Sequence, residues 1–351
     1  MSCKVCGGRN FGRLFLTLGT IVFFTALMLQ PATVSESVAA GMAVFRGKLV
    51  PVLFPYMVLS HFFCTYGLLD PLAALLPVGK LFRMNRCACG IFLLGHLCGY
   101  PVGAKMAAES VRQGKLSRRQ GEILCAVSSG ASPAFLIHVV GGGLWGDPFL
   151  GIFLLAVQIL FGVVSGTVLG RREQESAATE TVLREDIPFA RCFCEAVGGS
   201  AVQLVSIGGY IVFFTLFTAL LPFRGICGGL AAALLEFSAG VRMAAETGGM
   251  RGLFLTGFAV GFGGLSVLAQ TAHMVSGSGI SVRTYTLTKI VSGFIMGSAA
   301  LLYGFLRPDF PLRQITAAGI AVPVSVTDPV WFIGLLGMMW YFSLRHREMG
   351  Q

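Results

Sequence analysis

The chain has 351 residues, of which 55% are hydrophobic and only 12% are charged, so its polar residues are too few to cover a soluble globule of this size. Its formal net charge is +10, but the cations stand at the ends of apolar runs and in short loops, which indicates membrane topology rather than a nucleic-acid partner. The 47 glycines also suit membrane helices, which use glycine for close packing and for deliberate breaks. We therefore expect an all-α polytopic membrane protein.

Apolar runs without charge follow one another along the chain, and most reach the roughly 20 residues that span a bilayer. They cover 14–35, 49–69, 87–104, 123–146, 149–170, 196–223, 252–282 and 290–306, and a last apolar helix is expected near 330–344. The first run follows three cations and is alternatively a cleaved signal peptide with a small-residue site at 37–39. After allowance for re-entrant segments, the runs predict about eight transmembrane helices.

The runs divide the chain into five regions. These are a basic segment with the first transmembrane helix (1–45), a first repeat with its following helix (46–170), a hydrophilic cytoplasmic linker (171–195), a second repeat (196–276) and C-terminal transmembrane helices (277–351). Within the last region, the proline-rich stretch 308–329 is expected to be an extended outer loop.

Two segments have nearly the same sequence. Residues 103–110 are GAKMAAES, and residues 240–247 are GVRMAAET. Each lies in a glycine-rich background, and each is followed after a short connector by another apolar run. Such duplication is typical of transporters built from two related halves, which bind their solute where the halves meet.

The distribution of cations predicts that each repeat contains a re-entrant segment. If every apolar run crossed the membrane in turn, the cations of 80–86 and 112–119 would lie on opposite sides, which the positive-inside rule disfavours. A segment at 87–110 that enters, breaks at 99–101 and returns to the same side removes this conflict. Applied to 225–247 as well, it makes the halves inverted repeats and places most cations, Lys289 among them, in the cytoplasm.

The break in the first repeat is a candidate binding element. Gly99 and Pro101 stop a helix within the membrane, because proline removes a backbone donor and glycine lowers the cost of a turn. The freed backbone groups need partners, which a solute can supply. We include Gly103 and its repeat counterpart Gly240 in the candidate site. The alternative is a plain kinked helix.

A second polar break follows in each half. In the first half it contains Ser128, Ser129 and Ser132, and in the second half it is a glycine-rich stretch with Ser266, followed by Gln270. Hydroxyl groups, an amide and open backbone without charge suit a polar organic solute. The alternative is small-residue helix packing, with the serines bonding back to the preceding turn.

Charged residues within the repeats complete the candidate site. Lys105 and Arg242 hold equivalent positions, so two cations facing one cavity could bind a dicarboxylate; the alternative is that both extend to the membrane surface. Glu236 lies in an otherwise uncharged run and matches Gly99 in the repeat, which makes it a candidate for proton or cation coupling or for accepting hydrogen bonds.

These segments resemble the YlbJ-type sporulation integral membrane proteins, which carry the nucleoside-recognition or Gate domain. The resemblance rests on 99–105 (GYPVGAK), 128–133 (SSGASP), 235–236 (LE) and 263–266 (GGLS) with Gln270. It implies a protein in the cytoplasmic or forespore membrane of a spore-forming bacterium, with repeats similar to those of concentrative nucleoside transporters. It further implies transport of dipicolinic acid, a small aromatic dicarboxylate, across a forespore membrane.

We therefore expect a transporter of a small anionic or nucleoside-like solute, with dipicolinic acid as the leading candidate and with energy coupling to an ion left open. The alternatives are a nucleoside carrier, in which Ser266 and Gln270 matter more than the cations, and a non-transporting membrane scaffold in sporulation. Cys3 and Cys6 have metal-ligand spacing without a second pair, so no metal site or cofactor is predicted. The sequence also lacks the hydrolytic and phosphate-binding motifs that would indicate an enzyme.

Overall fold

The computed structural model describes residues 5–66, 68, 81–84, 86–171, 187–221 and 225–307, and over these residues the fold is all-α, as predicted. The proline-rich stretch 308–329 and the expected last helix at 330–344 lie outside the described residues. So do residues 172–186 of the expected linker.

Four helical spans in the described part of the chain are long and apolar enough to cross a membrane. They are α9 (Pro148–Gly170), α10 (Phe189–Ala219), the pair α13 and α14 taken together (Gly249–Val275), and α15 (Val282–Leu306). A bent pair near the N-terminus makes a fifth if it is counted as one span, and several shorter apolar helices accompany them. The chain therefore has several membrane-spanning helices, and the total of eight stays a prediction.

The N-terminal region differs from the expected single helix over 14–35. Helix α1 (Val5–Leu29) ends before Pro31, and α2 (Pro31–Val44) leaves at an angle of 97°. Proline has no N–H group to continue the hydrogen bonding of α1, but it suits the first turn of a new helix, which explains the bend. A π-helix (Phe45–Leu49) then joins α2 to α3 (Val50–Thr65). The stretch between the first two apolar runs is thus helical.

Each repeat contains a broken helical hairpin. The first hairpin consists of α6 (Arg86–Cys98) and α7 (Val102–Arg112), and the second of α11 (Gly225–Leu235) and α12 (Phe237–Thr247). In both cases the two short helices pack against each other. The first break falls at 99–101, as predicted, and the second falls at Glu236, the residue that matches Gly99 in the repeat.

Each hairpin is followed by a helix that is itself interrupted. In the first half, α8 (Arg118–Val127) ends at a break over 128–132, and the chain continues in the π-helix η2 (Phe135–Leu144). In the second half, α13 (Gly249–Phe262) and α14 (Gly264–Val275) are separated by Gly263, whose φ of +83° requires glycine. The same order of elements in both halves agrees with the sequence duplication.

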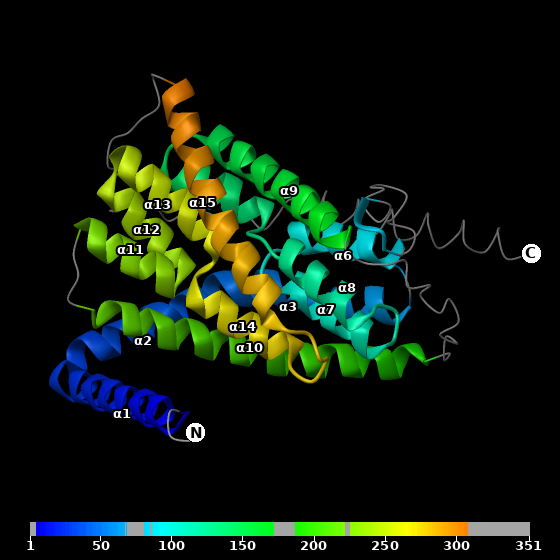
Figure 1. The fold of residues 1–351 in the computed structure, drawn as a ribbon, viewed down its shortest axis with the longest axis horizontal. Helices are drawn as coiled ribbons and strands as arrows, with labels where there is room; N and C mark the ends of the chain where they lie inside the picture. Colours follow the sequence, from blue (N-terminus) through cyan, green and yellow to red (C-terminus); the bar gives the residue numbers. More distant parts are fainter. Residues whose placement is uncertain are drawn as a thin grey trace, which may run out of the picture.

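The two hairpins lie on opposite sides of the molecule. In Figure 1, α6, α7 and α8 occupy the right side and α11, α12 and α13 the left, while α10 runs beneath both groups. One buried core joins α3, α6, α7 and α8 to the end of α14. The other joins η2, α9, α13 and α15, and it includes Tyr100 from the first hairpin. Each core therefore contains residues of both halves.

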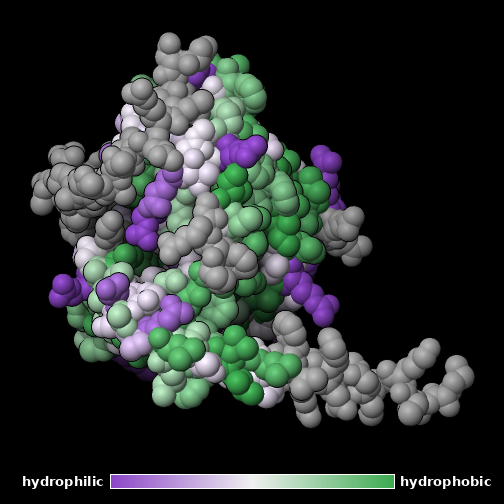
Figure 2. Space-filling model, turned by 90° about the vertical axis from the view of Figure 1, so that its left-hand side faces the viewer, coloured by the Kyte–Doolittle hydropathy of each residue, from purple (hydrophilic) through white to green (hydrophobic). Residues whose placement is uncertain are grey.

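The outer surface is strongly apolar. Large hydrophobic side chains such as Leu160, Val205 and Phe305 are exposed on α9, α10 and α15. Figure 2 shows hydrophobic residues over much of one face, with the hydrophilic residues in separate groups. Such a surface is suited to lipid rather than to water.

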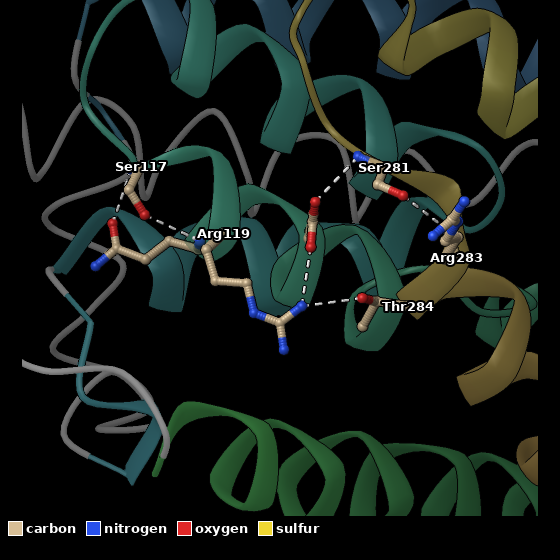
Figure 3. A network of polar contacts seen from close by, with 7 residues as sticks. Ser117, Arg119, Ser281, Arg283 and Thr284 are labelled. Atoms are coloured by element: carbon tan, nitrogen blue, oxygen red, sulfur yellow. Dashed lines mark hydrogen bonds and ion pairs between the residues drawn. The ribbon is translucent and has the colours of Figure 1, made fainter.

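Hydrogen bonds from other parts of the chain hold both ends of helix α15. Near its N-terminus, Arg119 of α8 donates to Thr284 Oγ1 (3.0 Å), and the Glu122 carboxylate accepts from the Ser281 backbone N–H (3.2 Å; Figure 3). Near its C-terminus, the Tyr303 hydroxyl donates to the Asp147 carboxylate (2.6 Å), which precedes α9. We call the contacts of Arg119 and Glu122 with the start of α15 the α8–α15 clasp.

Candidate functional site

The break in the first hairpin packs tightly against the break after α8. Gly99 has a φ of +81°, and a Cβ atom placed on it would lie 3.0 Å from the Ser132 backbone nitrogen. Glycine is therefore required at Gly99 both for its backbone conformation and for this contact. Pro101 is buried beside it. The first two predicted breaks thus meet in space.

Protein side chains satisfy backbone groups of the break over 128–132. The Gln158 amide of α9 accepts from the Ala131 N–H and donates to the Ala131 carbonyl, both at 3.0 Å. Lys289 of α15 donates to the Ser129 carbonyl. The Ser128 and Ser129 hydroxyls bond back to carbonyls of the preceding turn, as in the packing alternative.

Ser132 acts in the turn that follows the break. Its hydroxyl accepts from the Phe135 N–H at 3.3 Å, and its side chain is only partly buried. Side chains of the described residues thus satisfy backbone groups of this break.

Glu236 caps the second half of its own hairpin. Its side chain is buried (2% exposed), and one carboxylate oxygen accepts from the Ala239 N–H (2.7 Å) and from the Ser238 hydroxyl (2.6 Å). The other oxygen accepts from the Ser238 N–H at 3.2 Å. An acid at this position satisfies free N–H groups and complements the positive end of the α12 dipole.

The tips of the two hairpins meet at the centre of the protein. The Tyr100 hydroxyl donates to the Val260 carbonyl (3.1 Å), and Gly263 lies against the Tyr100 ring. The Tyr100 and Phe237 rings are 5.8 Å apart, and Phe135 lies 5.1 Å from Phe237. The breaks at 99–101, 128–132, Glu236 and Gly263 therefore surround one point, which we call the crossing of the breaks.

Ser266 and Gln270 lie one turn apart in α14, and both are buried. The Gln270 amide donates to the Ser266 hydroxyl at 3.1 Å. Helix α14 packs against α7 of the other half. The pair is thus an uncharged polar group within the contact between the halves.

Lys105 lines a cavity between α3, α7 and α10. The lysine is 4% exposed, and its ammonium group donates to the Met57 carbonyl (2.8 Å) and to the Ser200 hydroxyl (3.3 Å). These bonds use two of its three donors, so the third can serve a ligand. The cavity has a volume of about 290 Å³ and is lined by His61, Lys105, Glu109, Arg112, Gln113, Glu195, Ala196, Gly199, Ser200 and Gln203.

The cavity carries charges of both signs. His61 Nδ1 lies 2.9 Å from a Glu109 carboxylate oxygen. The Arg112 guanidinium also lines the cavity, and it donates to the Met274 and Ser276 carbonyls at the end of α14. We call this cavity between α3, α7 and α10 the Lys105 cavity. Its lining is suited to a polar solute that has both anionic groups and hydrogen-bonding groups.

Arg242 and Lys105 hold equivalent places in the repeat, but their surroundings differ. Arg242 and Glu246 are exposed, and the Lys105 cavity includes neither of them. The structure therefore does not bring the two cations together in that cavity. The glycines of the repeats serve close packing, since a Cβ atom on Gly103 would collide with the Ser128 carbonyl and one on Gly240 with the Ala233 backbone.

Sequence reasoning missed three residues at the crossing of the breaks. Lys289 was expected in the cytoplasm, but α15 begins at Val282 rather than near residue 290, so this lysine lies within the helix and is buried. Tyr100 lies in the 99–105 motif, but neither Tyr100 nor Gln158 is given a role in the sequence analysis. The available signal was a single polar residue in a long apolar stretch, since Lys289 is the one cation between residues 284 and 306.

Comparison with known proteins agrees with this architecture. The chain is 22% identical over 318 residues to the sporulation integral membrane protein YlbJ of Bacillus subtilis (strain 168), and the match covers 78% of each chain. No family model and no solved structure matches the chain. The predicted resemblance to YlbJ-type sporulation integral membrane proteins is confirmed, and with its membrane-spanning helices the chain is an integral membrane protein.

Proposed function

We propose that this protein is a transporter that carries a small polar solute, with dipicolinic acid as the leading candidate, across a membrane during spore formation. The observation that carries the proposal is the crossing of the breaks. Breaking helices inside a membrane is costly unless the freed backbone groups find partners, and transporters use such breaks to build solute sites at the midplane. A protein that only anchored other proteins would not need two broken hairpins with tips that meet.

The arrangement of the halves supports alternating access. The first hairpin packs on α3 and α8 of its own half and on α14 of the other, and the second packs on α13 of its own half. The hairpins meet through Tyr100 and Phe237 at their tips. In transporters with inverted repeats, one half rocks against the other around a fixed site. We propose the same motion here, with the hairpin tips separating to admit the solute.

The Lys105 cavity supports an anionic solute. Its Lys105 ammonium retains a donor, and Arg112 adds a second cation to its lining. The volume of about 290 Å³ is near the lower end for small-molecule sites, which suits a compact molecule such as a small aromatic dicarboxylate. In this proposal the cavity is the solute's place on one side of the crossing of the breaks.

The setting comes from the relative. The similar Bacillus subtilis protein is, by its name, an integral membrane protein of sporulation, and its organism is a spore-forming bacterium. We propose a corresponding role for this chain, in the cytoplasmic or forespore membrane. A nucleoside carrier is the second candidate, because Ser266 and Gln270 form a buried uncharged pair where α14 meets α7.

The first experiment is thermal unfolding of the purified protein with dipicolinate, with nucleosides and with simple dicarboxylates. A ligand that binds only the folded state raises the melting temperature in proportion to occupancy. We expect dipicolinate to raise it in the wild type and not in Lys105→Ala. The matched control is Arg242→Ala, in which the shift should persist because Arg242 lies outside the Lys105 cavity.

Flux of labelled solute into proteoliposomes then separates transport from binding. A shift with nucleosides alone, abolished in Gln270→Ala, would favour the nucleoside carrier. Folded protein that shows neither a shift nor flux with any of these solutes would contradict the transporter proposal and favour a membrane scaffold.

A further inference from the structure

Lys289 is a lysine of α15 that is buried inside the protein. It is 5% exposed, and none of the ion pairs in the described part of the chain includes it. A buried ammonium group is strongly disfavoured unless its surroundings replace the water that it has lost. Lys289 therefore keeps its positive charge only through contacts that stabilise the ammonium group.

Those contacts are oxygen atoms and aromatic faces. The ammonium group donates to the Ser129 carbonyl and to the Tyr100 hydroxyl, the latter at 3.2 Å. It also lies 4.8 Å from the centre of the Tyr100 ring and 5.9 Å from that of Tyr285, where the negative ring faces attract a cation. These groups share one property, which is that each attracts positive charge without carrying a formal negative charge.

The position of the Ser129 carbonyl strengthens this attraction. Helix α8 ends at Val127 inside the protein, and Ser129 follows it directly in the break. The C-terminal end of a helix carries a partial negative charge, which favours a nearby cation. The Lys289 ammonium thus lies at the negative end of a half-helix.

Oxygen atoms freed by an unwound helix, together with half-helix C-termini, are the surroundings in which broken-helix transporters coordinate Na⁺. Here an ammonium group that is covalently attached to α15 occupies such surroundings. We propose that Lys289 is a built-in cation at the crossing of the breaks, which takes the place of a bound monovalent metal ion.

This role has a structural consequence. One ammonium group connects Tyr100 of the first hairpin, Ser129 of the first broken helix, and α15, which follows the second repeat. A metal ion could dissociate from this position, whereas the lysine side chain cannot leave. The inference rests on the proposed function only where it predicts that transport needs no sodium ion at the crossing of the breaks. That Lys289 replaces a bound metal ion does not depend on any solute.

The test is thermal unfolding at constant ionic strength in sodium, potassium and choline chloride. The wild type should melt at the same temperature in all three salts. Lys289→Ala, which opens space beside the freed carbonyl, should melt lower in choline and regain several degrees, with saturation, as sodium or potassium replaces choline. Arg283→Ala removes an exposed cation from the same helix and should respond to the salts as the wild type does.

Either of two results would overturn the proposal. One is a wild-type melting temperature that rises selectively and saturably with sodium, and the other is a Lys289→Ala protein that melts equally in all three salts. If the alanine variant does not fold, Lys289→Arg and Lys289→Met replace it. Arginine keeps the charge and should preserve more stability than methionine, and equal stability of these two variants would also overturn the proposal.

Because no solute is present, this outcome is independent of whether the protein transports dipicolinate. In proteoliposomes, replacing sodium by choline should leave wild-type flux unchanged. Absence of flux in both salts would bear on the proposed function and not on the role of Lys289.

Discussion

The two hairpins share a sequence pattern, but they differ in what covers them. In the first hairpin every residue of 102–108 is buried, Lys105 included, because α3, α8 and α14 pack around α7. In the second hairpin, α12 packs chiefly on α11 and α13, and both Arg242 and Glu246 are exposed. Equivalent charged residues thus lie inside a cavity in one half and at the surface in the other.

Duplication has therefore preserved the local structure of the hairpin but not the helices that surround it. Gly103 and Gly240 permit close packing in the two hairpins, and in each hairpin the helix breaks just before the repeated segment. The neighbours decide whether a repeated cation becomes a site residue. We therefore expect changes at packed positions to affect both hairpins, and changes at the repeated charges to affect only the first.

The largest effect is expected at the shared glycines. Gly103→Val and Gly240→Val should each lower the free energy of unfolding by about 3 kcal/mol or more, because the new side chain collides with rigid backbone. Gly198→Val in α10 is the matched control, since no atom lies within 4 Å of a Cβ atom at that position. The yield of folded protein and the melting temperature measure the effect. Normal folding of either variant would contradict the packing described here.

The repeated cations provide the sharpest contrast. Lys105→Met should lower the free energy of unfolding by about 1–3 kcal/mol, because Met57 and Ser200 lose a buried charged partner. Arg242→Met should change it by less than about 0.5 kcal/mol, because the side chain is exposed. Thermal unfolding of both variants tests the difference. If the two variants were equally destabilised, the hairpins would not differ as the structure indicates.

Glu236 has no charged counterpart in the first hairpin, where Gly99 holds its place. Glu236→Ala should cost about 1–2 kcal/mol of stability through loss of the helix cap. Glu236→Gln retains an acceptor oxygen and should recover most of that loss. Flux separates capping from ion coupling. If the glutamine variant is stable but does not transport, the carboxylate acts in coupling as well as in capping.

A small effect is expected at the α8–α15 clasp, which lies away from both hairpins. Glu122→Gln keeps an acceptor for the Ser281 N–H but removes the charge that pairs with Arg119 at 2.9 Å. Because Arg119 is partly exposed, the loss should be about 0.5 kcal/mol and should diminish at high salt. A loss as large as that for Lys105→Met would mean that the clasp, rather than the hairpins, holds the halves together.

The membrane class, the duplication and most of the helix breaks could be predicted from the sequence alone. Apolar run length decides whether a helix can span, and glycine or proline within a run decides where it stops, so both are local properties. Glu236 could be singled out for the same reason, since an acid within an apolar run must have a partner. The bend before Pro31 was equally local and could have been predicted.

The residues that lie beside each break depend instead on the tertiary structure. Gln158 and Lys289 are distant in sequence from the break over 128–132, and they reach it only because α9 and α15 pack against α8. Likewise Lys105 is a cavity residue and Arg242 is not, although their local sequences nearly match. Such differences arise from contacts between remote helices, and a local pattern carries no information about which helices will meet.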